Sequence, residues 1–244
     1  GNGHGMHSPF IYDFIRNVLN NKQRFPSYEQ IENVRKDLYK NNQLLQIEDM
    51  GAGSAVSKNN IRSVKEVARH ALKRKRLSQL LFRIVDYYQL KNIVELGTSL
   101  GITTSYLASA NNTKVFTIEG SPAIAEIAKQ NFKKLNLSNI NLEIGHFDEL
   151  LPGVLEKMQT VDLAFIDGNH AKEPTIRYFE MLLPYINENS IIIFDDIHWS
   201  LGMEEAWNQI KANKIVSLSI DLFFLGIVFF KKSFKEKQDF TIRF

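Results

Sequence analysis

The chain of 244 residues contains no cysteine, which excludes a disulfide framework, a cysteine-ligated zinc site and a thiol nucleophile. Proline is scarce, with 6 residues, and glycine numbers 13, so collagen-like and low-complexity architectures are excluded. The longest apolar run, Leu222–Phe230, is far shorter than the roughly 20 residues of a membrane-spanning helix. Residues 1–10 also lack the basic and apolar regions of a signal peptide. We therefore expect a cytoplasmic protein.

The composition is that of an ordinary globular protein, with 44% hydrophobic and 23% charged residues. A disordered chain would lack this apolar mass. The net charge of +3 is unevenly distributed, because eight basic residues between Lys58 and Arg76 are opposed by Glu66 alone. Their helical spacing predicts a solvated helix face, and contact with the phosphates of a nucleic acid is the alternative.

Residues 1–76 predict an N-terminal helical extension. Ser8 and Pro9 are typical of a helix start, residues 27–30 resemble a capping box, and an apolar stripe at helical spacing begins at Ile61. The glycine-rich residues 51–54 predict a flexible loop that could act as a lid. We expect this extension to cover the ligand of the following domain and to shape its acceptor site.

Residues 77–244 predict a second domain in which strands alternate with helices. This alternation indicates a parallel sheet with helices on both faces. The link near Asp221 is too short for a right-handed crossover, so the last two strands should be antiparallel. The predicted fold class is therefore α/β: a doubly wound, Rossmann-like, seven-stranded sheet, mostly parallel with an antiparallel last strand, plus the N-terminal helices. The predicted strands are 93–96, 115–119, 141–144, 162–167, 191–195, 214–220 and 223–230.

Ligands of such sheets bind at the carboxyl ends of the strands. The first strand ends in a turn between Gly97 and Gly101, which permits close approach of a ligand to the backbone. Ser99 stands where the dinucleotide fingerprint requires glycine, which argues against NAD. Glu119 follows Gly97 by 22 residues, a spacing that suits hydrogen bonds with ribose hydroxyls. Together these features favour a nucleoside-type ligand, with a plain strand-to-helix turn as the alternative.

Three segments, Val94–Gly101, Thr117–Gly120 and Phe165–His170, resemble the class I S-adenosylmethionine-dependent methyltransferases. Within that superfamily they are similar to the metal-dependent small-molecule O-methyltransferases of the catechol, caffeoyl-CoA and macrolide-sugar types. The resemblance covers about residues 77–230. It implies transfer of a methyl group from S-adenosylmethionine to a hydroxyl of a small molecule, and it is compatible with a homodimer.

The resemblance also implies a set of cofactor contacts at the ends of the first, second, third and fourth strands. The family usually carries a small or acidic residue where His146 and Phe147 stand, so these two positions depart from its pattern. Phe147 could instead stack on the adenine. The expected cofactor-binding residues are Glu95, Gly97, Thr98, Ser99, Gly101, Glu119, Gly120, His146, Phe147 and Asp167.

Carboxylates close the fourth and fifth strands at Asp167, Asp195 and Asp196. Neighbouring strands lie about 4.8 Å apart, so these groups should converge and repel one another. A divalent cation would relieve the repulsion, and oxygen ligands favour Mg²⁺. The family carries its metal ligands at these positions, so we expect Asp167, Asp195 and Asp196 to hold the metal. Helix or turn capping by Asp195 and Asp196 is the alternative.

His170 is the expected catalytic base beside Asp167, because it stands near the position where catechol-type relatives carry a lysine base. A neutral histidine titrates near physiological pH and can accept a hydroxyl proton. His198 and Trp199 could line the acceptor pocket.

Two other functions are compatible with the sequence. The basic segment 58–76 would suit an RNA or other nucleic-acid methyltransferase. However, the tetrad Asn/Asp-Pro-Pro-Tyr/Phe of base-amino methylating enzymes is absent after the fourth strand, which argues against a nucleic-acid partner. The domain could also be a catalytically silent module that only binds the cofactor.

Overall fold

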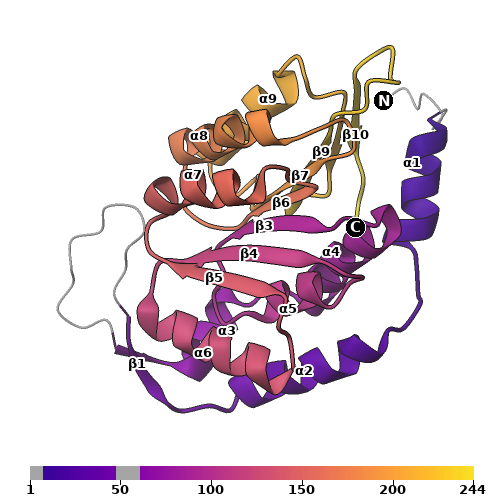
Figure 1. Ribbon diagram of the computed structural model, residues 1–244. Helices are drawn as coiled ribbons and strands as arrows, with labels where there is room; N and C mark the ends of the chain where they lie inside the picture. The colour runs from indigo at the N-terminus through magenta and orange to yellow at the C-terminus, as the bar shows by residue number, and fades with distance from the viewer. Residues whose placement is uncertain (1–7, 48–60) are drawn as a thin grey trace.

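The structure is a computed structural model that describes residues 8–47 and 61–244, and a large mixed sheet lies at its centre (Figure 1). The eight strands of this sheet pair in the order β10-β8-β9-β7-β6-β3-β4-β5. The strand β9 is antiparallel to β7 and β8, and all other neighbouring pairs are parallel. The strands are β3 (Asn92–Leu96), β4 (Lys114–Glu119), β5 (Ile140–Ile144), β6 (Leu163–Ile166), β7 (Ile191–Asp195), β8 (Leu218–Asp221), β9 (Leu225–Phe229) and β10 (Gln238–Thr241).

Helices cover both faces of the sheet (Figure 1). One face carries α4 (Lys75–Tyr88), α5 (Ile102–Ala108) and α6 (Pro122–Lys134), and the other carries α7 (Phe147–Met158), α8 (Lys172–Leu182) and α9 (Leu201–Ala212). A short 3₁₀ turn, η2 (Leu183–Tyr185), follows α8. Successive strand residues point to opposite faces; in β7, Ile193 joins the core of the first face and Ile192 that of the second.

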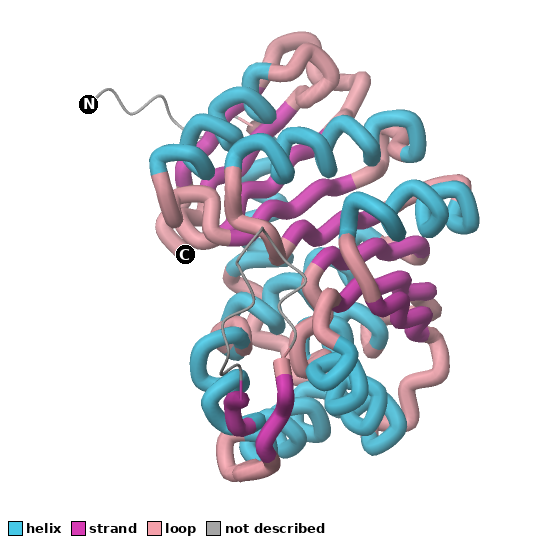
Figure 2. The backbone as a smooth tube through the Cα atoms, turned by 90° about the vertical axis from the view of Figure 1, so that its left-hand side faces the viewer, coloured by secondary structure: helices cyan, strands magenta, loops and turns pink. Residues whose placement is uncertain are grey.

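The N-terminal helices share the core of the first face. They are α1 (Pro9–Phe14), which continues as the π-helix η1 (Ile15–Leu19), then α2 (Pro26–Leu38) and α3 (Val64–Ala71). Helix α2 packs on α5, and η1 packs on α4. A small antiparallel pair, β1 (Leu44–Gln46) with β2 (Ile61–Ser63), lies apart from the large sheet (Figure 2). In the described ranges, no helix is both long and apolar enough to cross a bilayer.

The doubly wound α/β fold with antiparallel β8 and β9 is confirmed, but the predicted strand number was one too low. The missed strand, β10, pairs in parallel with β8 at the sheet edge. Its burial alternates between intermediate and exposed, and such a short, wet edge strand carries little hydrophobic signal.

Two predicted helix starts in the N-terminal extension were wrong. Helix α2 begins at Pro26, which fixes a helical φ angle, and Phe25 rather than Ser27 is the N-cap residue. The capping box is instead formed by Ser63 and Glu66 at the start of α3, so Ile61 belongs to a strand. The glycine-rich segment 51–54, expected to be a lid, lies outside the described residues.

Candidate functional site

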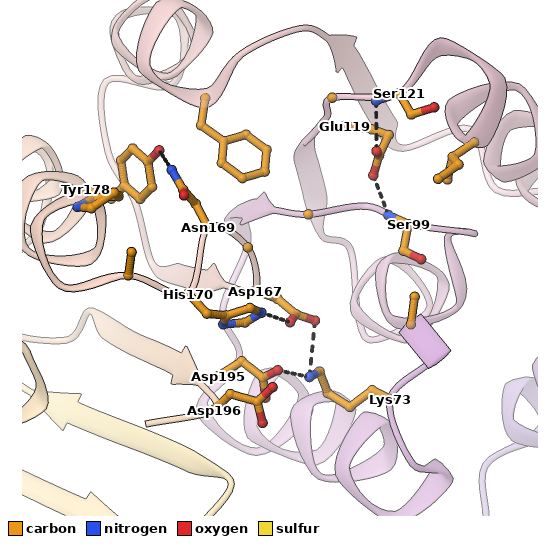
Figure 3. A pocket seen from close by; sticks show the side chains of 18 of the residues that line it. Lys73, Ser99, Glu119, Ser121, Asp167, Asn169, His170, Tyr178, Asp195 and Asp196 are labelled. Atoms are coloured by element: carbon orange, nitrogen blue, oxygen red, sulfur yellow. Dashed lines mark hydrogen bonds and ion pairs between the residues drawn. The ribbon is translucent and has the colours of Figure 1, made fainter. Parts of the chain in front are cut away.

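A cavity of about 1000 Å³ opens at the carboxyl ends of β3, β4, β6 and β7. Its wall also includes the start of α7 and the linker between α3 and α4. Figure 3 shows two groups of polar side chains in this cavity, one around Glu119 and one around Asp167. The carboxyl ends of these four strands therefore meet around one cavity.

The turn after β3 brings the backbone of two strands into close contact. Gly97 has a φ of +100°, and a Cβ atom on it would lie 2.1 Å from the carbonyl oxygen of Asp167. The amide of Gly97 donates to the carbonyl oxygen of Ile118 on β4 (3.0 Å). Only glycine fits this position, because a side chain there would be strained and would push the β3 and β6 loops apart.

The carboxylate of Glu119 accepts two hydrogen bonds from backbone amides. The amide of Ser99 donates to Oε2 (2.8 Å) and that of Ser121 to Oε1 (2.9 Å). Burial raises the pKa of Glu119, and the backbone hydrogen bonds oppose this rise. Each carboxylate oxygen can accept a further hydrogen bond. The buried hydroxyls of Ser99 and Ser121 have no partner among the described residues, so this group is suited to bind the hydroxyls of a ligand.

The opposite wall is formed by the first turn of α7. A Cβ atom on Gly168 would lie 2.7 Å from the ring of Phe147, so that ring rests on the loop after β6. Tyr178 meets Phe147 edge-on, with 6.0 Å between ring centroids, and accepts a hydrogen bond from Asn169 (3.0 Å). His146 lines the cavity beside them. This wall offers an aromatic and amide surface for a planar ligand group.

The acidic end of the cavity contains three groups that converge. Ligand atoms of Asp167, His170 and Asp195 all lie within 4.8 Å of one another, and His170 Nε2 is 3.9 Å from Asp167 Oδ1. Burial raises the pKa of Asp195, the neighbouring Asp167 adds to this effect, and the ammonium of Lys73 opposes it. The Oδ1 atom of Asp195 has no hydrogen-bond partner in the described chain.

The ammonium of Lys73 lies between the two aspartates (Figure 3). Lys73 Nζ is 3.2 Å from Asp167 Oδ2 and also forms an ion pair with Asp195 Oδ2. Burial opposes its charge, but the two carboxylates outweigh this cost and raise the pKa of Lys73. The site therefore contains its own cation.

Comparisons with known proteins agree with this architecture. Residues 94–197 match the protein family described as "Methyltransferase domain". A catechol O-methyltransferase of Niastella koreensis is 32% identical over 113 residues, which are 45% of this chain and 50% of that protein. The chain thus spans about half the length of that curated relative.

Solved structures share the fold of the large sheet and its helices. An O-methyltransferase from Bacillus cereus, in complex with SAH, has a TM-score of 0.56 at 22% identity over 90% of this chain and 97% of its own. The O-methyltransferase TomG from Streptomyces achromogenes, in complex with SAM, has a TM-score of 0.61 at 15% identity, with coverages of 91% and 95%. At this identity, the likeness establishes the fold alone.

Most residues expected to bind the cofactor line the cavity: Gly97, Ser99, Glu119, Gly120, His146, Phe147 and Asp167. Thr98, Gly101 and Glu95 do not line it. Glu95 is fully buried beneath the turn, where Oε2 accepts hydrogen bonds from Thr104 (2.5 Å) and Thr117 (2.7 Å). Its burial raises the pKa of Glu95 to about 8.

The predicted acidic trio is only partly assembled. Asp196 lines the cavity but does not belong to the convergent group, whose third member is His170. The φ angle of Asp196 is 51°, and its amide donates to the carbonyl oxygen of Phe224 (2.7 Å). The backbone therefore leaves the extended conformation of β7 at this residue.

Two further expectations about side chains differ from the structure. His198 does not line the cavity; its ring nitrogens contact Asp221 (2.8 Å) and Glu204 (3.2 Å) instead. Burial opposes the charge of this ring, but the two carboxylates raise the pKa of His198. Lys73 belongs to the basic segment predicted to be a solvated face, yet its side chain is 8% exposed. The sequence contains only a weak signal that Lys73 is buried: it follows Leu72, the last residue of the apolar stripe that includes α3.

Proposed function

We propose that this protein is an S-adenosylmethionine-dependent O-methyltransferase that acts on a hydroxyl of a small molecule. The observation that carries the proposal is that one cavity joins Glu119 to the convergent group of Asp167, His170 and Asp195. The first part suits a nucleoside, and the second suits an acceptor hydroxyl that must lose its proton. The partial match to a catechol O-methyltransferase supports the same reaction class.

The cofactor fits the Glu119 side of the cavity by the chemistry of its donors and acceptors. Ribose hydroxyls would donate to the free acceptor positions of Glu119, and the unpartnered hydroxyls of Ser99 and Ser121 lie beside them. The adenine would lie against Phe147. The methionine end would then extend past Gly97, where the absence of a side chain allows close approach.

The acceptor would bind at the acidic end, next to His170. S-adenosylmethionine supplies an activated methyl group on a sulfonium, so the protein mainly positions the two reactants for in-line displacement. As the oxygen–carbon bond forms and the carbon–sulfur bond breaks, the hydroxyl proton passes to His170. Asp167 lies 3.9 Å from the ring nitrogen of His170 and would stabilise the imidazolium that results.

A divalent cation at Asp167 and Asp195 was part of our expectation from the sequence. Carboxylate oxygens are the ligands that Mg²⁺ prefers, and these two residues converge. However, Lys73 Nζ occupies the space between them. A second cation does not fit there while the ammonium is in place.

The remaining expectations stay proposals. We propose the division into a helical extension (1–76) and a methyltransferase domain (77–244), although the extension shares a hydrophobic core with the sheet. A homodimer also stays a prediction. The nucleic-acid alternative loses part of its support, because Lys73 points into the cavity and Arg74 and Arg76 pack on the rings of Phe224 and Phe244.

A direct assay tests the function. The purified protein is incubated with S-adenosylmethionine and a panel of phenols, catechols and aliphatic alcohols, and S-adenosylhomocysteine and methylated products are quantified by mass spectrometry. We expect product with at least one hydroxyl compound and binding of S-adenosylhomocysteine by calorimetry. If neither cofactor form binds, the proposal is wrong.

A further inference from the structure

The acidic end of the cavity contains a cation that belongs to the protein, the ammonium of Lys73. Lys73 Nζ contacts one oxygen of Asp167 and one of Asp195, and the three side chains are 8%, 18% and 4% exposed. An ammonium has three N–H donors, and these two ion pairs use two of them. One donor therefore remains for a group that enters the cavity.

The backbone that carries Lys73 is fixed from the neighbouring helix α2. Arg35 Nη1 donates to the carbonyl oxygen of Lys73 (2.7 Å), and Arg35 Nε pairs with Glu32 Oε1 (3.0 Å). Arg35 is 5% exposed, so this contact is part of the interior. Lys73 thus enters the site from a linker between α3 and α4 that is itself held by a buried arginine.

A single monovalent cation lies between the two acids of the site. The buried carboxylates of Asp167 and Asp195 would repel each other without an intervening positive charge. The ammonium of Lys73 already supplies that charge at the midpoint. A divalent ion bound to the same oxygens would be repelled by the ammonium, so the two cations exclude each other.

We infer that Lys73 takes the place of a divalent cation in this protein. Its ammonium holds Asp167 and Asp195 in position and donates a hydrogen bond to the acceptor oxygen, so that methyl transfer requires no metal ion. This inference rests on the proposed function.

The substitution of a lysine for a metal also defines the class of acceptor. An ammonium with a single charge stabilises a developing oxyanion less than a divalent Lewis acid does. The reaction is then best suited to hydroxyls that ionise readily, such as phenols, whose pKa in tyrosine is about 10. During transfer, the O–H proton passes to His170, the new bond forms between oxygen and the methyl carbon, and the sulfonium becomes a neutral thioether.

The test uses binding of Mn²⁺, followed by the loss of free-ion signal in electron paramagnetic resonance, together with turnover of a phenol. The variant is Lys73→Met, which keeps an unbranched side chain, one atom shorter, and removes its charge. The control is Lys75→Met, since Lys75 is exposed and does not line the cavity. Wild type and control should bind no Mn²⁺ at stoichiometric ratios and should keep full turnover in EDTA.

The Lys73→Met variant should gain a Mn²⁺ site, because Asp167, His170 and Asp195 lose their internal cation. In EDTA its turnover should fall about 100-fold, as expected when one preorganised donor to a developing oxyanion is removed, and Mn²⁺ should restore part of it. Stoichiometric binding of Mn²⁺ to wild type, abolished by Asp167→Asn, would overturn the inference. So would loss of wild-type turnover in EDTA.

The titration of wild type with Mn²⁺ tests the inference about Lys73 even if the Lys73→Met variant does not fold. Calorimetry with S-adenosylhomocysteine separates the two proposals. If the cofactor product does not bind, the methyltransferase function fails, whereas binding of Mn²⁺ by wild type contradicts only the role of Lys73.

Discussion

Substitution of Glu119 by glutamine tests how the cavity binds the nucleoside. The variant keeps the shape of the side chain but removes its charge and turns one oxygen into an amide nitrogen. Both carboxylate oxygens now accept a backbone hydrogen bond, from Ser99 at 2.8 Å and from Ser121 at 2.9 Å. In the variant, one of these amides would face an NH₂ donor, and the ribose hydroxyls would lose a charged acceptor.

A hydrogen bond to a charged group contributes about 1.5–3 kcal/mol, so the combined loss should approach about 3 kcal/mol. This corresponds to a roughly 100-fold weaker binding of S-adenosylhomocysteine, measured by isothermal titration calorimetry. The matched control is Glu126→Gln, whose side chain is 62% exposed on α6; we expect its affinity to equal that of wild type. Circular dichroism checks that both variants fold. A folded Glu119→Gln variant with affinity within threefold of wild type would refute this account of the nucleoside site.

Three further predictions follow from other groups at the strand ends. Gly97→Ala should abolish measurable binding of S-adenosylhomocysteine in calorimetry, because its Cβ would lie 2.1 Å from the Asp167 carbonyl oxygen; unchanged affinity would contradict the close packing of the two loops. His170→Asn should lower the turnover of a phenol at least about 100-fold with unchanged calorimetric affinity for S-adenosylhomocysteine, and undiminished turnover would exclude His170 as the base. Burial raises the pKa of Glu95 to about 8, so the folded protein keeps it neutral while the unfolded chain ionises it above about 4.5. The free energy of unfolding should therefore fall by up to about 5 kcal/mol as the pH rises from about 4.5 to about 8. Urea titrations of Glu95→Gln at several pH values should show a weaker dependence of this free energy on pH. An unchanged pH dependence in the variant would refute the neutral state of Glu95 in the folded protein.

The parallel core of the fold was predictable because its signals are local and strong. Strand β7 is a continuous apolar segment that ends in Asp195, and each strand from β3 to β7 is followed by a turn and a helix. The topology then dictates that the strand ends meet at one edge. For this reason, Glu119 and Asp167 could be placed in one cavity from the sequence alone.

The parts that were missed depend on contacts between distant segments. Lys73 reaches Asp195 across 122 residues of chain, and its position depends on Arg35 in another helix. No periodicity in the sequence reports such a contact, and the basic residues around Lys73 made a solvated face the simpler interpretation. Likewise, the left-handed φ angle of Asp196 is a property of the backbone at a single residue, which residue type does not reveal.

A crystal structure of the protein with S-adenosylhomocysteine tests the central claim most directly. We predict that the ribose hydroxyls lie within hydrogen-bond distance of Glu119, and that the sulfur atom faces the group formed by Asp167, His170 and Asp195. A ligand bound outside this cavity, or one whose sulfur points away from that group, would contradict the account.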